Sequence, residues 1–310
     1  MISVVVCTYN RAESLRGTLD SLAQMYIPPG LRWELIVVDN NSTDHTREVV
    51  EEFAQTSGLH VRYVFEGNQG LAYARNTGIR EAKEAQGEII AFMDDDMTPD
   101  EQWLANLRTV FDAHNCMGVG GRIIPKWNAP KPSWLQMEAP YGIGPGVLGD
   151  FSLGEEPKET RIPPWGGNMA FRREAFERYG HFRTDLGLVG TQRMLGEDTE
   201  FGRRLIKAGE KIVYTPLAVV YHRVDQDRLT KAYVLSYYFN SGRTAIREEG
   251  WPEQAVCYFG VPRYLFRSCM ENFLRWMVAL NGERRFYHKL QVYMNAGEIF
   301  EAYKLARGGV

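Results

Sequence analysis

The sequence predicts an α/β protein, in which a mostly parallel, Rossmann-like β-sheet is flanked by helices and followed by a helical C-terminal extension. Two observations lead to this fold class. Up to residue 96, apolar β-branched runs alternate with segments whose apolar residues recur at helical spacing. Polar clusters also follow three of the predicted strands. This alternation favours a parallel sheet with helices on both faces, which binds ligands at the carboxyl ends of its strands.

A buried strand followed by a helix is predicted near the N-terminus. Residues 2–8 (ISVVVCT) are β-branched and nearly all apolar, which is typical of a strand covered on both faces. Asn10 is a good helix N-cap, and Glu13 stands three residues later, as in a capping box. Leucines then recur on one helical face until Pro28 and Pro29 end the pattern.

The remaining elements are predicted in the same way, strands from apolar runs and helices from apolar residues at helical spacing. Strands are predicted at 34–38, 61–65 and 88–93, with helices at 44–53 and 71–79 between them. The proline-rich stretch 115–161 predicts an irregular segment. Helices at 173–179 and 198–208, short strands at 211–214 and 219–221, and a helical region from 225 complete the chain. We therefore expect an α/β domain at 1–224 and a helical extension at 225–310.

Composition and charge exclude several classes of protein. Lys and Arg number 36 against 39 Asp and Glu, so no basic excess points to nucleic acid. The four cysteines form no CxxC pair and are too few for a disulfide scaffold. No signal peptide is predicted, because the apolar run 1–7 lacks a basic leader. No apolar run is long enough to predict a transmembrane helix, so a cytoplasmic protein is expected.

Three adjacent carboxylates, Asp94, Asp95 and Asp96, follow the fourth predicted strand. Because like charges repel, burying them close together requires a compensating cation. Carboxylate oxygens suit Mg²⁺ or Mn²⁺, which commonly bind one or two carboxylates plus substrate phosphates. An acidic surface turn is the alternative, but the position at the end of a parallel strand favours a metal site.

Two further carboxylates stand at the ends of predicted elements. Asp39 ends the second strand, where it can accept a hydrogen bond from a nucleotide or, like Ser42, cap the next helix. Asp198 follows Gly196 and Glu197 at the start of a predicted helix. The helix dipole favours an ionised carboxylate there, which suits a general base and equally describes an ordinary cap.

A glycine-rich turn and a single histidine are the last candidates. Gly166 and Gly167 allow the backbone to approach a ligand closely, and Trp165 can stack on a sugar face or be a buried structural residue. His222 follows the apolar run 219–221, where it is either a metal ligand or a structural histidine.

Six segments of the chain match, in order, the motifs of one known family. They are VVVCTYNR at 4–11, ELIVVDNNSTDHT at 34–46, AYARNTGI at 72–79, GEIIAFMDDD at 87–96, GGNMAFRR at 166–173 and GEDTEFGRRL at 196–205. Together they span roughly residues 1–223 and resemble the inverting glycosyltransferases of family 2, which have the GT-A fold. Six ordered matches are more specific than any single motif.

The resemblance implies roles for individual residues. Asp39 would contact a uracil-type base, Asp96 would ligate the metal, and Asp198 would be the catalytic base. His222 matches a late histidine that ligates metal in some members. Donor and nucleotide would be bound by Thr8, Tyr9, Asn10, Arg11, Asp39, Arg75, Asp94 and Asp95. The acceptor side would hold Trp165, Gly167, Asn168 and Glu197.

The implied reaction is metal-dependent transfer of a sugar from a nucleotide sugar, of the UDP type, to a glycan or lipid-linked acceptor, as in polysaccharide biosynthesis. Asp198 would take the proton of the acceptor hydroxyl as its oxygen attacks the anomeric carbon, and one direct displacement inverts the configuration. The metal would neutralise the departing diphosphate. Processive members share a Gln-x-x-Arg-Trp motif, and the nearest string here, NFLRW at 272–276, lacks the glutamine. A non-processive enzyme is therefore expected.

Two other functions share some of these features. A sugar-phosphate nucleotidyltransferase also uses carboxylates, a metal and an α/β domain, but its glycine-rich, lysine-bearing phosphate loop is missing after the first strand, where residues 8–11 read TYNR. A non-catalytic nucleotide-sugar-binding protein would have no need of both Asp96 and Asp198.

The C-terminal region mixes aromatic and basic residues between Tyr264 and Lys289. Helices of this kind can lie on an anionic membrane surface, which would place the protein peripherally on the inner face of the membrane. The alternative is that they pack on the catalytic domain or on another subunit of a homo-oligomer.

Overall fold

The computed structural model describes residues 1–137, 140–189 and 192–308, which form two compact units. The first unit comprises Met1–Lys126, Gly149–Thr184 and Glu197–Arg223. The second comprises Trp127–Leu148, Asp185–Gly196 and Val224–Val310. The main division thus falls beside the expected boundary at 224, but two inserted segments of the expected α/β domain belong to the second unit. One reason is that Leu135 and Ile143 are buried in a cluster with Val234 and Leu290 of the C-terminal helices.

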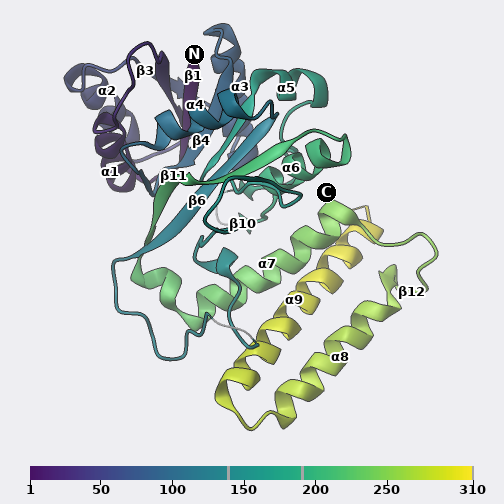
Figure 1. Cartoon of the computed structure of the whole chain (residues 1–310). Helices are drawn as coiled ribbons and strands as arrows, with labels where there is room; N and C mark the ends of the chain where they lie inside the picture. Colours follow the sequence, from purple (N-terminus) through teal and green to yellow (C-terminus); the bar gives the residue numbers. More distant parts are fainter. Residues whose placement is uncertain (138–139, 190–191, 309–310) are drawn as a thin grey trace. The chain divides into compact units, whose positions relative to one another are not determined.

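A mixed β-sheet of nine described strands forms the centre of the first unit (Figure 1). Across the sheet the order is β3 (Val61–Phe65), β2 (Trp33–Asp39), β1 (Ile2–Thr8), β4 (Ile89–Asp94), β8 (Met169–Arg172), β6 (Gly118–Trp127), β11 (Ile212–Val224) and β5 (Met97–Pro99), and β7 (Lys158–Glu159) also pairs with β11. The strands from β3 to β4 are parallel. Antiparallel pairs join β8 to β4 and β6, and β11 to β5 and β7. The predicted α/β class is therefore confirmed, with an antiparallel part that the sequence does not indicate.

Helices cover both faces of this sheet. They are α1 (Ala12–Ala23), α2 (Thr46–Thr56), α3 (Leu71–Glu84), α4 (Trp103–Ala113), α5 (Arg173–Tyr179) and α6 (Glu197–Lys207). Alternate residues of β1 point to opposite faces. Val4 and Val6 join the core that includes α1, α2 and α4, whereas Val5 and Cys7 join the core that includes α3, α5 and α6. Burial on both faces explains why this strand reads as a continuous apolar run.

Two elements of the first unit differ from the sequence prediction for local reasons. β6 lies inside the stretch predicted to be irregular, because glycines are uncommon in strands and this strand contains several. Glycine is required there, since a Cβ at Gly118 would collide with Phe171 and one at Gly121 with Asn168. β11 is one long strand rather than two short ones, and it continues through Pro216 in its interior.

The start of α1 also differs from the prediction. The N-cap residue is Arg11 and makes no capping side-chain hydrogen bond, so Asn10 is not the cap. Asn10 adopts a left-handed conformation (φ 51°), and its side-chain oxygen accepts a hydrogen bond from Thr43 N (2.6 Å). It therefore fastens the β1–α1 loop to the β2–α2 loop.

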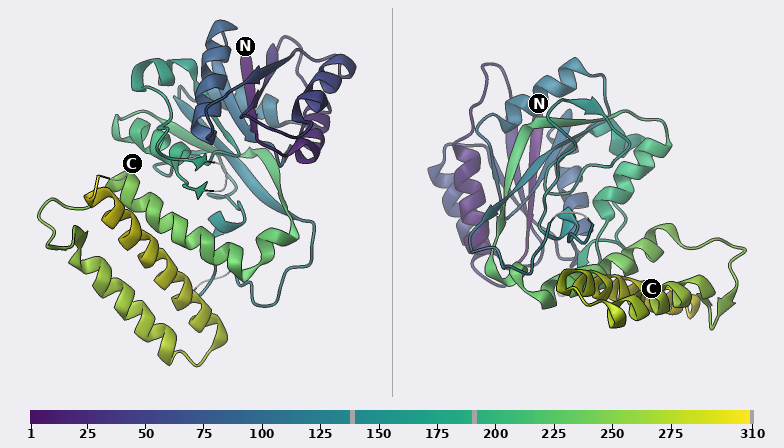
Figure 2. Two further views of the ribbon diagram at one scale, coloured as in Figure 1. Left: turned by 180° about the vertical axis from the view of Figure 1, so that it is seen from behind. Right: turned by 60° about the horizontal axis from the view of Figure 1, so that its bottom comes forward.

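Three long helices dominate the second unit: α7 (Lys231–Glu249), α8 (Arg263–Val278) and α9 (Gly282–Ala306). They lie in one layer, with α9 between α7 and α8 (Figures 1 and 2). α7 and α9 meet backbone to backbone, since a Cβ at Gly242 would collide with the Met294 carbonyl and one at Gly297 with the Phe239 carbonyl. Short elements complete the unit: 3₁₀ turns at Pro145–Val147 and Gln226–Leu229, and the strand pairs β9 (Leu188–Val189) with β10 (Gln192–Arg193) and β12 (Cys257–Tyr258) with β13 (Val261–Pro262).

The lengths and hydropathy of the helices show whether any of them could cross a membrane. Among the residues that the structure describes, none of the helices combines the length and the apolar character needed to cross a bilayer.

Candidate active site

The aspartates at the end of β4 form a buried turn that is tied to the first strand and helix. Thr8 Oγ1, at the end of β1, donates a hydrogen bond to Asp95 Oδ2 (2.7 Å). Ser14 and Thr18 of α1 both donate to the Asp95 carbonyl oxygen at 2.9 Å. Asp95 and Asp96 are only 4% and 7% exposed. The turn is therefore not the exposed acidic loop of the alternative interpretation.

Arg11 neutralises part of this negative charge. Its Nη1 lies 2.8 Å from Asp95 Oδ1, and its Nη2 lies 3.0 Å from Asp96 Oδ2. Burial raises the pKa of Asp95 above its ordinary value, and the charge of Arg11 opposes that rise. The Arg11 side chain is still 40% exposed. A positive charge therefore lies between these buried carboxylates and the solvent.

His222 is brought beside Asp96 by strand pairing. β5 and β11 are antiparallel, with Met97 opposite His222. His222 Nε2 consequently lies 3.6 Å from Asp96 Oδ2, and both side chains are buried. Gly149, in a left-handed conformation (φ 67°), packs on the imidazole, and a Cβ there would lie 2.7 Å from Nδ1. The two residues assigned to the metal from the sequence are therefore neighbours in space.

The donor atoms of this pair can be compared with the needs of a metal ion. In the described part of the chain, no three His, Cys, Asp or Glu side chains are arranged to hold one. Asp96 and His222 nevertheless supply a carboxylate and an imidazole side by side. Mg²⁺ is usually bound through one or two carboxylates with substrate phosphates, and not by a complete cage of protein ligands. Two protein ligands thus fit an ion that arrives with a diphosphate.

Arg75 links the aspartate turn to the start of α6. Its Nη2 lies 3.0 Å from Asp94 Oδ1, and its Nη1 forms an ion pair with Glu197 Oε1. Arg75 and Glu197 are both buried. Burial raises the pKa of Glu197, and the Arg75 charge opposes that rise. Glu197 was expected on the acceptor side, but its carboxylate is instead engaged by Arg75.

Asp198, the next residue, has a different environment. Its Oδ2 accepts a hydrogen bond from Gly166 N, and its Oδ1 accepts one from Thr199 N (2.7 Å). Both bonds fix the orientation of the carboxylate. Unlike Glu197, Asp198 is only partly buried. Of the two neighbouring acids, Asp198 is therefore the one that a substrate can reach.

The glycine pair serves the packing of the protein itself. A Cβ at Gly166 would collide with the guanidinium group of Arg75, and one at Gly167 would collide with Met97 and lie 3.3 Å from Asp94 Oδ2. The glycines were expected to let a ligand approach, and Gly167 to face the acceptor. The groups that approach them are instead side chains of the site, which glycine allows to pack closely.

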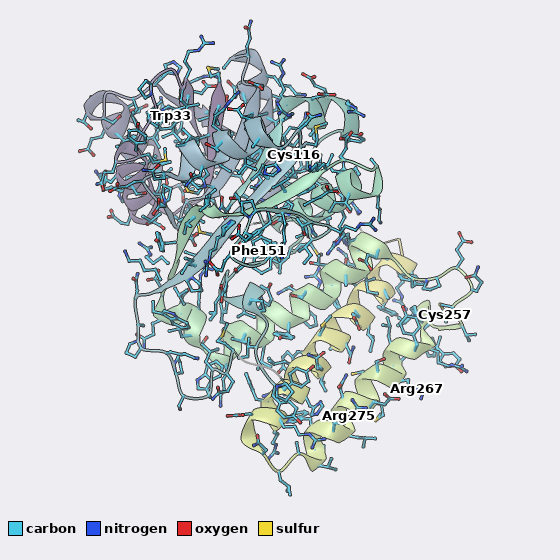
Figure 3. The ribbon with its side chains drawn as sticks, in the orientation of Figure 1. Trp33, Cys116, Phe151, Cys257, Arg267 and Arg275 are labelled. Carbon is cyan, nitrogen blue, oxygen red and sulfur yellow. The ribbon has the colours of Figure 1, made fainter. Side chains whose placement is uncertain are left out.

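Asn168, also expected on the acceptor side, is a structural residue. Asn168 is completely buried, accepts a hydrogen bond from Trp103 Nε1 (2.9 Å), and donates to the carbonyl oxygens of Arg122 and Ala218. It therefore has no amide hydrogen left for an acceptor. Trp165 is half-buried against Phe151, which is labelled in Figure 3, with ring centroids 4.7 Å apart.

The residues expected on the nucleotide side include Asp39. Its Oδ1 accepts a hydrogen bond from Ser42 N (2.9 Å), and its Oδ2 accepts one from the Tyr63 hydroxyl (2.8 Å). The carboxylate thus fixes the loop after β2. Neither Asp39 nor Ser42 caps the next helix, because the N-cap residue of α2 is His45 and no capping side-chain hydrogen bond is made there. Tyr9, which follows β1, is half-buried.

Sequence reasoning missed two residues that hold the site together. Asn40 is buried, accepts a hydrogen bond from Gly70 N (2.7 Å) and donates to Asn68 O (2.7 Å), so it joins the end of β2 to the start of α3. Its place in the polar cluster after β2 was the available signal. Gly149, behind His222, had no signal in the sequence.

Comparison with known proteins assigns the chain to a family. The model of "Glycosyl transferase family 2" matches residues 3–180. Glucosyl-dolichyl phosphate glucuronosyltransferase of Haloferax volcanii is 32% identical over 232 residues, which cover 73% of this chain and 70% of that protein. Succinoglycan biosynthesis protein ExoM of Rhizobium meliloti is 29% identical over 253 residues, 78% of this chain and 73% of that protein.

Solved structures give the fold. Mannosyltransferase PcManGT from Pyrobaculum calidifontis, in complex with GDP-Man and Mn²⁺, has a TM-score of 0.56 at 19% identity and covers 100% of this chain and 75% of that chain. TarS 1–349 from S. aureus has a TM-score of 0.53 at 16% identity and covers 99% and 91%. At these identities the likeness shows the GT-A fold alone. With the family model matching more than half of its length, the chain belongs to glycosyl transferase family 2 and is a glycosyltransferase.

Proposed function

We propose that this glycosyltransferase moves a sugar from a UDP-type nucleotide sugar to a hydroxyl group of a glycan or lipid-linked acceptor, with inversion and with a divalent metal ion. One observation carries the proposal. Arg75 is ion-paired both with Asp94, the first of the three aspartates, and with Glu197, the neighbour of Asp198. The carboxylates for the metal and the carboxylate for the base therefore belong to one charged cluster.

Asp198 is the proposed general base. Two backbone N–H groups donate hydrogen bonds to its carboxylate and so hold it in one orientation. The acceptor hydroxyl gives its proton to Asp198 as its oxygen forms a bond to the anomeric carbon. The bond between that carbon and the diphosphate breaks in the same displacement, and the electron pair leaves with the diphosphate. Attack from the opposite side inverts the anomeric configuration.

Asp96 and His222 are the proposed ligands of Mg²⁺ or Mn²⁺. When bound, such an ion would neutralise charge on the departing diphosphate. Arg11 is close enough to add positive charge at the same place, because it contacts Asp95 and Asp96 and remains partly exposed. PcManGT was solved with GDP-Man and Mn²⁺, and GalNAc-T7, with a TM-score of 0.57, was solved with UDP, GalNAc and Mn²⁺. These complexes support a nucleoside diphosphate with a metal ion.

The donor and acceptor classes rest on less specific support. The UDP type depends on Asp39, whose carboxylate would contact the base beside its partner Tyr63. A lipid-linked acceptor is supported by the name of the Haloferax relative, a glucosyl-dolichyl phosphate glucuronosyltransferase. A glycan-type acceptor is supported by poly(ribitol-phosphate) β-N-acetylglucosaminyltransferase TarS, which is 30% identical over 154 residues.

Non-processive transfer fits the place of the string NFLRW in α8. Asn272 Nδ2 donates a hydrogen bond to Asn295 of α9 (3.0 Å), and Lys289 of α9 stands over the ring of Trp276. These residues join two helices of the second unit, as expected of a structural segment and not of a motif that guides a growing polymer.

A donor screen tests the proposal. The protein would be incubated with UDP- and GDP-sugars, with Mn²⁺ and with chelator, while the melting temperature and donor hydrolysis are measured. The correct donor should raise the melting temperature, since it binds only the folded state. With a suitable acceptor, nuclear magnetic resonance should then show an inverted anomeric carbon in the product. A retained configuration would refute the proposed inversion. Equal donor hydrolysis with Mn²⁺ and with chelator would refute the proposed metal dependence.

A further inference from the structure

α8 carries a row of exposed apolar side chains. Phe266, Met270, Phe273, Leu274 and Met277 are 39% to 57% exposed. Their positions follow the spacing i, i+4, i+7, i+8 and i+11, which places them on one stripe of the helix. Residues with this spacing normally form the side of a helix that is buried against another element.

The opposite side of α8 already has its partner in α9. Leu265 is buried, Asn272 is hydrogen-bonded to Asn295, and Trp276 lies beneath Lys289. α8 is also at the edge of the three-helix layer, because α9 lies between it and α7 (Figure 1). The helix therefore packs against α9 on one side and carries the exposed apolar stripe on another.

The apolar surface continues beyond both ends of the stripe. Val278 and Leu280, at the C-terminal end of the helix, are largely and fully exposed. Before its N-terminal end, the turn around β12 exposes Val256, Tyr258 and Phe259, the last at 90%. Contiguous exposed apolar surface of this kind marks an interaction site more often than chance.

Basic residues accompany this surface. Residues 251–310 contain eight Lys and Arg against five Asp and Glu, although acidic residues are in excess over the whole chain. Arg267 and Arg275 of α8 are labelled in Figure 3. Arg267 is ion-paired with Glu271 (2.8 Å). No carboxylate of the described residues lies within ion-pair distance of Arg263, Arg275, Arg284 or Arg285.

We infer that the exposed stripe of α8 docks on an anionic lipid surface, with the helix lying in the plane of the membrane. The apolar side chains would enter the boundary between headgroups and acyl chains, and the arginines would reach lipid phosphates while their aliphatic parts stay on the apolar surface. A second copy of the chain is a poorer partner, because it would bring arginines of the same sign together. The inference does not depend on the proposed transferase chemistry.

Vesicle flotation of the full chain tests this inference with a matched pair of variants. Leu274 on α8 and Leu217 on β11 are both 55% exposed. The wild type should float with vesicles made of equal parts phosphatidylcholine and phosphatidylglycerol. Leu274→Glu should lower the bound fraction at least about tenfold, because a charge replaces a leucine that would enter the membrane, and Leu217→Glu should bind like the wild type. Circular dichroism would show that both variants are folded.

The charge of the surface is tested by salt, lipid and arginine variants. Binding should weaken at high salt, with pure phosphatidylcholine, and in the double variant Arg263→Gln/Arg275→Gln. The inference is overturned if the wild type stays unbound with anionic vesicles, or if Leu274→Glu and Leu217→Glu lose binding equally. It is also overturned if the wild type ignores vesicles but forms a dimer that Leu274→Glu dissociates, since the stripe would then be an interface between copies.

Discussion

The two units depart from the rule of apolar interior and polar surface in opposite directions. The first unit buries charges: Asp95, Asp96 and Glu197 are each at most 7% exposed. The second unit exposes apolar side chains, of which Leu274 and Met277 are more than half exposed. Buried charges are tolerated only when they are paired, and exposed apolar surface is tolerated most easily when it has a function. Each departure therefore points to a different kind of partner, a cation with a phosphate in one unit and lipid in the other.

The second unit also buries a charge, and that charge is balanced differently. Glu301 is completely buried and pairs with Arg243 (2.8 Å) and Arg247. There one glutamate meets two arginines between packed helices. Around β4, the carboxylates of Asp94, Asp95, Asp96 and Glu197 form ion pairs with Arg11 and Arg75. Two arginines around one glutamate make a structural ion pair, whereas consecutive carboxylates at the end of a strand suit a site that also binds a cation.

The largest effect is expected from removing one of the carboxylates at the end of β4. Asp96→Ala should abolish detectable transfer while the fold is kept, because the variant loses one of the two proposed metal ligands. Chelation of the wild type should do the same, and Mn²⁺ or Mg²⁺ should restore activity. Asp20→Ala, an exposed position on α1, is the control and should be fully active. Full wild-type turnover in excess chelator would contradict the metal assignment.

The next effect separates the two neighbouring acids. Asp198→Asn should reduce turnover by about 10²–10⁴-fold with donor affinity little changed, as for loss of a general base. Glu197→Gln should mainly lower the free energy of unfolding, by roughly 3 kcal/mol, because it leaves Arg75 without one of its buried partners. Turnover, donor binding and urea unfolding would be measured for both. Normal turnover in Asp198→Asn would make that carboxylate a structural cap.

The packing of the second unit is tested at its closest helix contact. Gly242→Ala should lower the free energy of unfolding by about 1–3 kcal/mol, because the new Cβ would collide with the Met294 carbonyl of α9. Gly17→Ala is the matched control, since it lies within α1 with open space around its Cβ, and it should be neutral or stabilising. Equal urea midpoints for the two variants would show that α7 and α9 can separate freely.

The smallest effect concerns pH. Burial, followed by the charges of Arg284 and Arg275, lowers the pKa of His288 below its ordinary value. The unfolded chain then binds a proton at a higher pH than the folded chain does. Stability should therefore fall as the pH is lowered from about 7 to about 5. His288→Gln should show a shallower loss, measured as the difference between the two profiles, and identical profiles would mean that this histidine titrates normally.

The elements that the sequence predicts correctly are those whose pattern is local. Residues 2–8 form β1 because a strand buried on both faces has to be apolar along its whole length. The inward spacing of Phe201 and Leu205 gave α6 to within a residue of its observed bounds. β6 was missed because its glycines accommodate Phe171 and Asn168, which are distant in sequence.

By itself the sequence determined the strand-and-helix alternation, the aspartates after β4 and the likeness to family 2, because periodicity and short motifs are properties of neighbouring residues. The tertiary structure decided which charges meet. β5 pairs with β11 and so brings His222 to Asp96, and Arg75 takes Glu197 while Asp198 stays accessible. It also decided which side of α8 is covered by α9. These outcomes depend on which distant segments approach each other, and local spacing specifies that a side chain will be buried without specifying its partner.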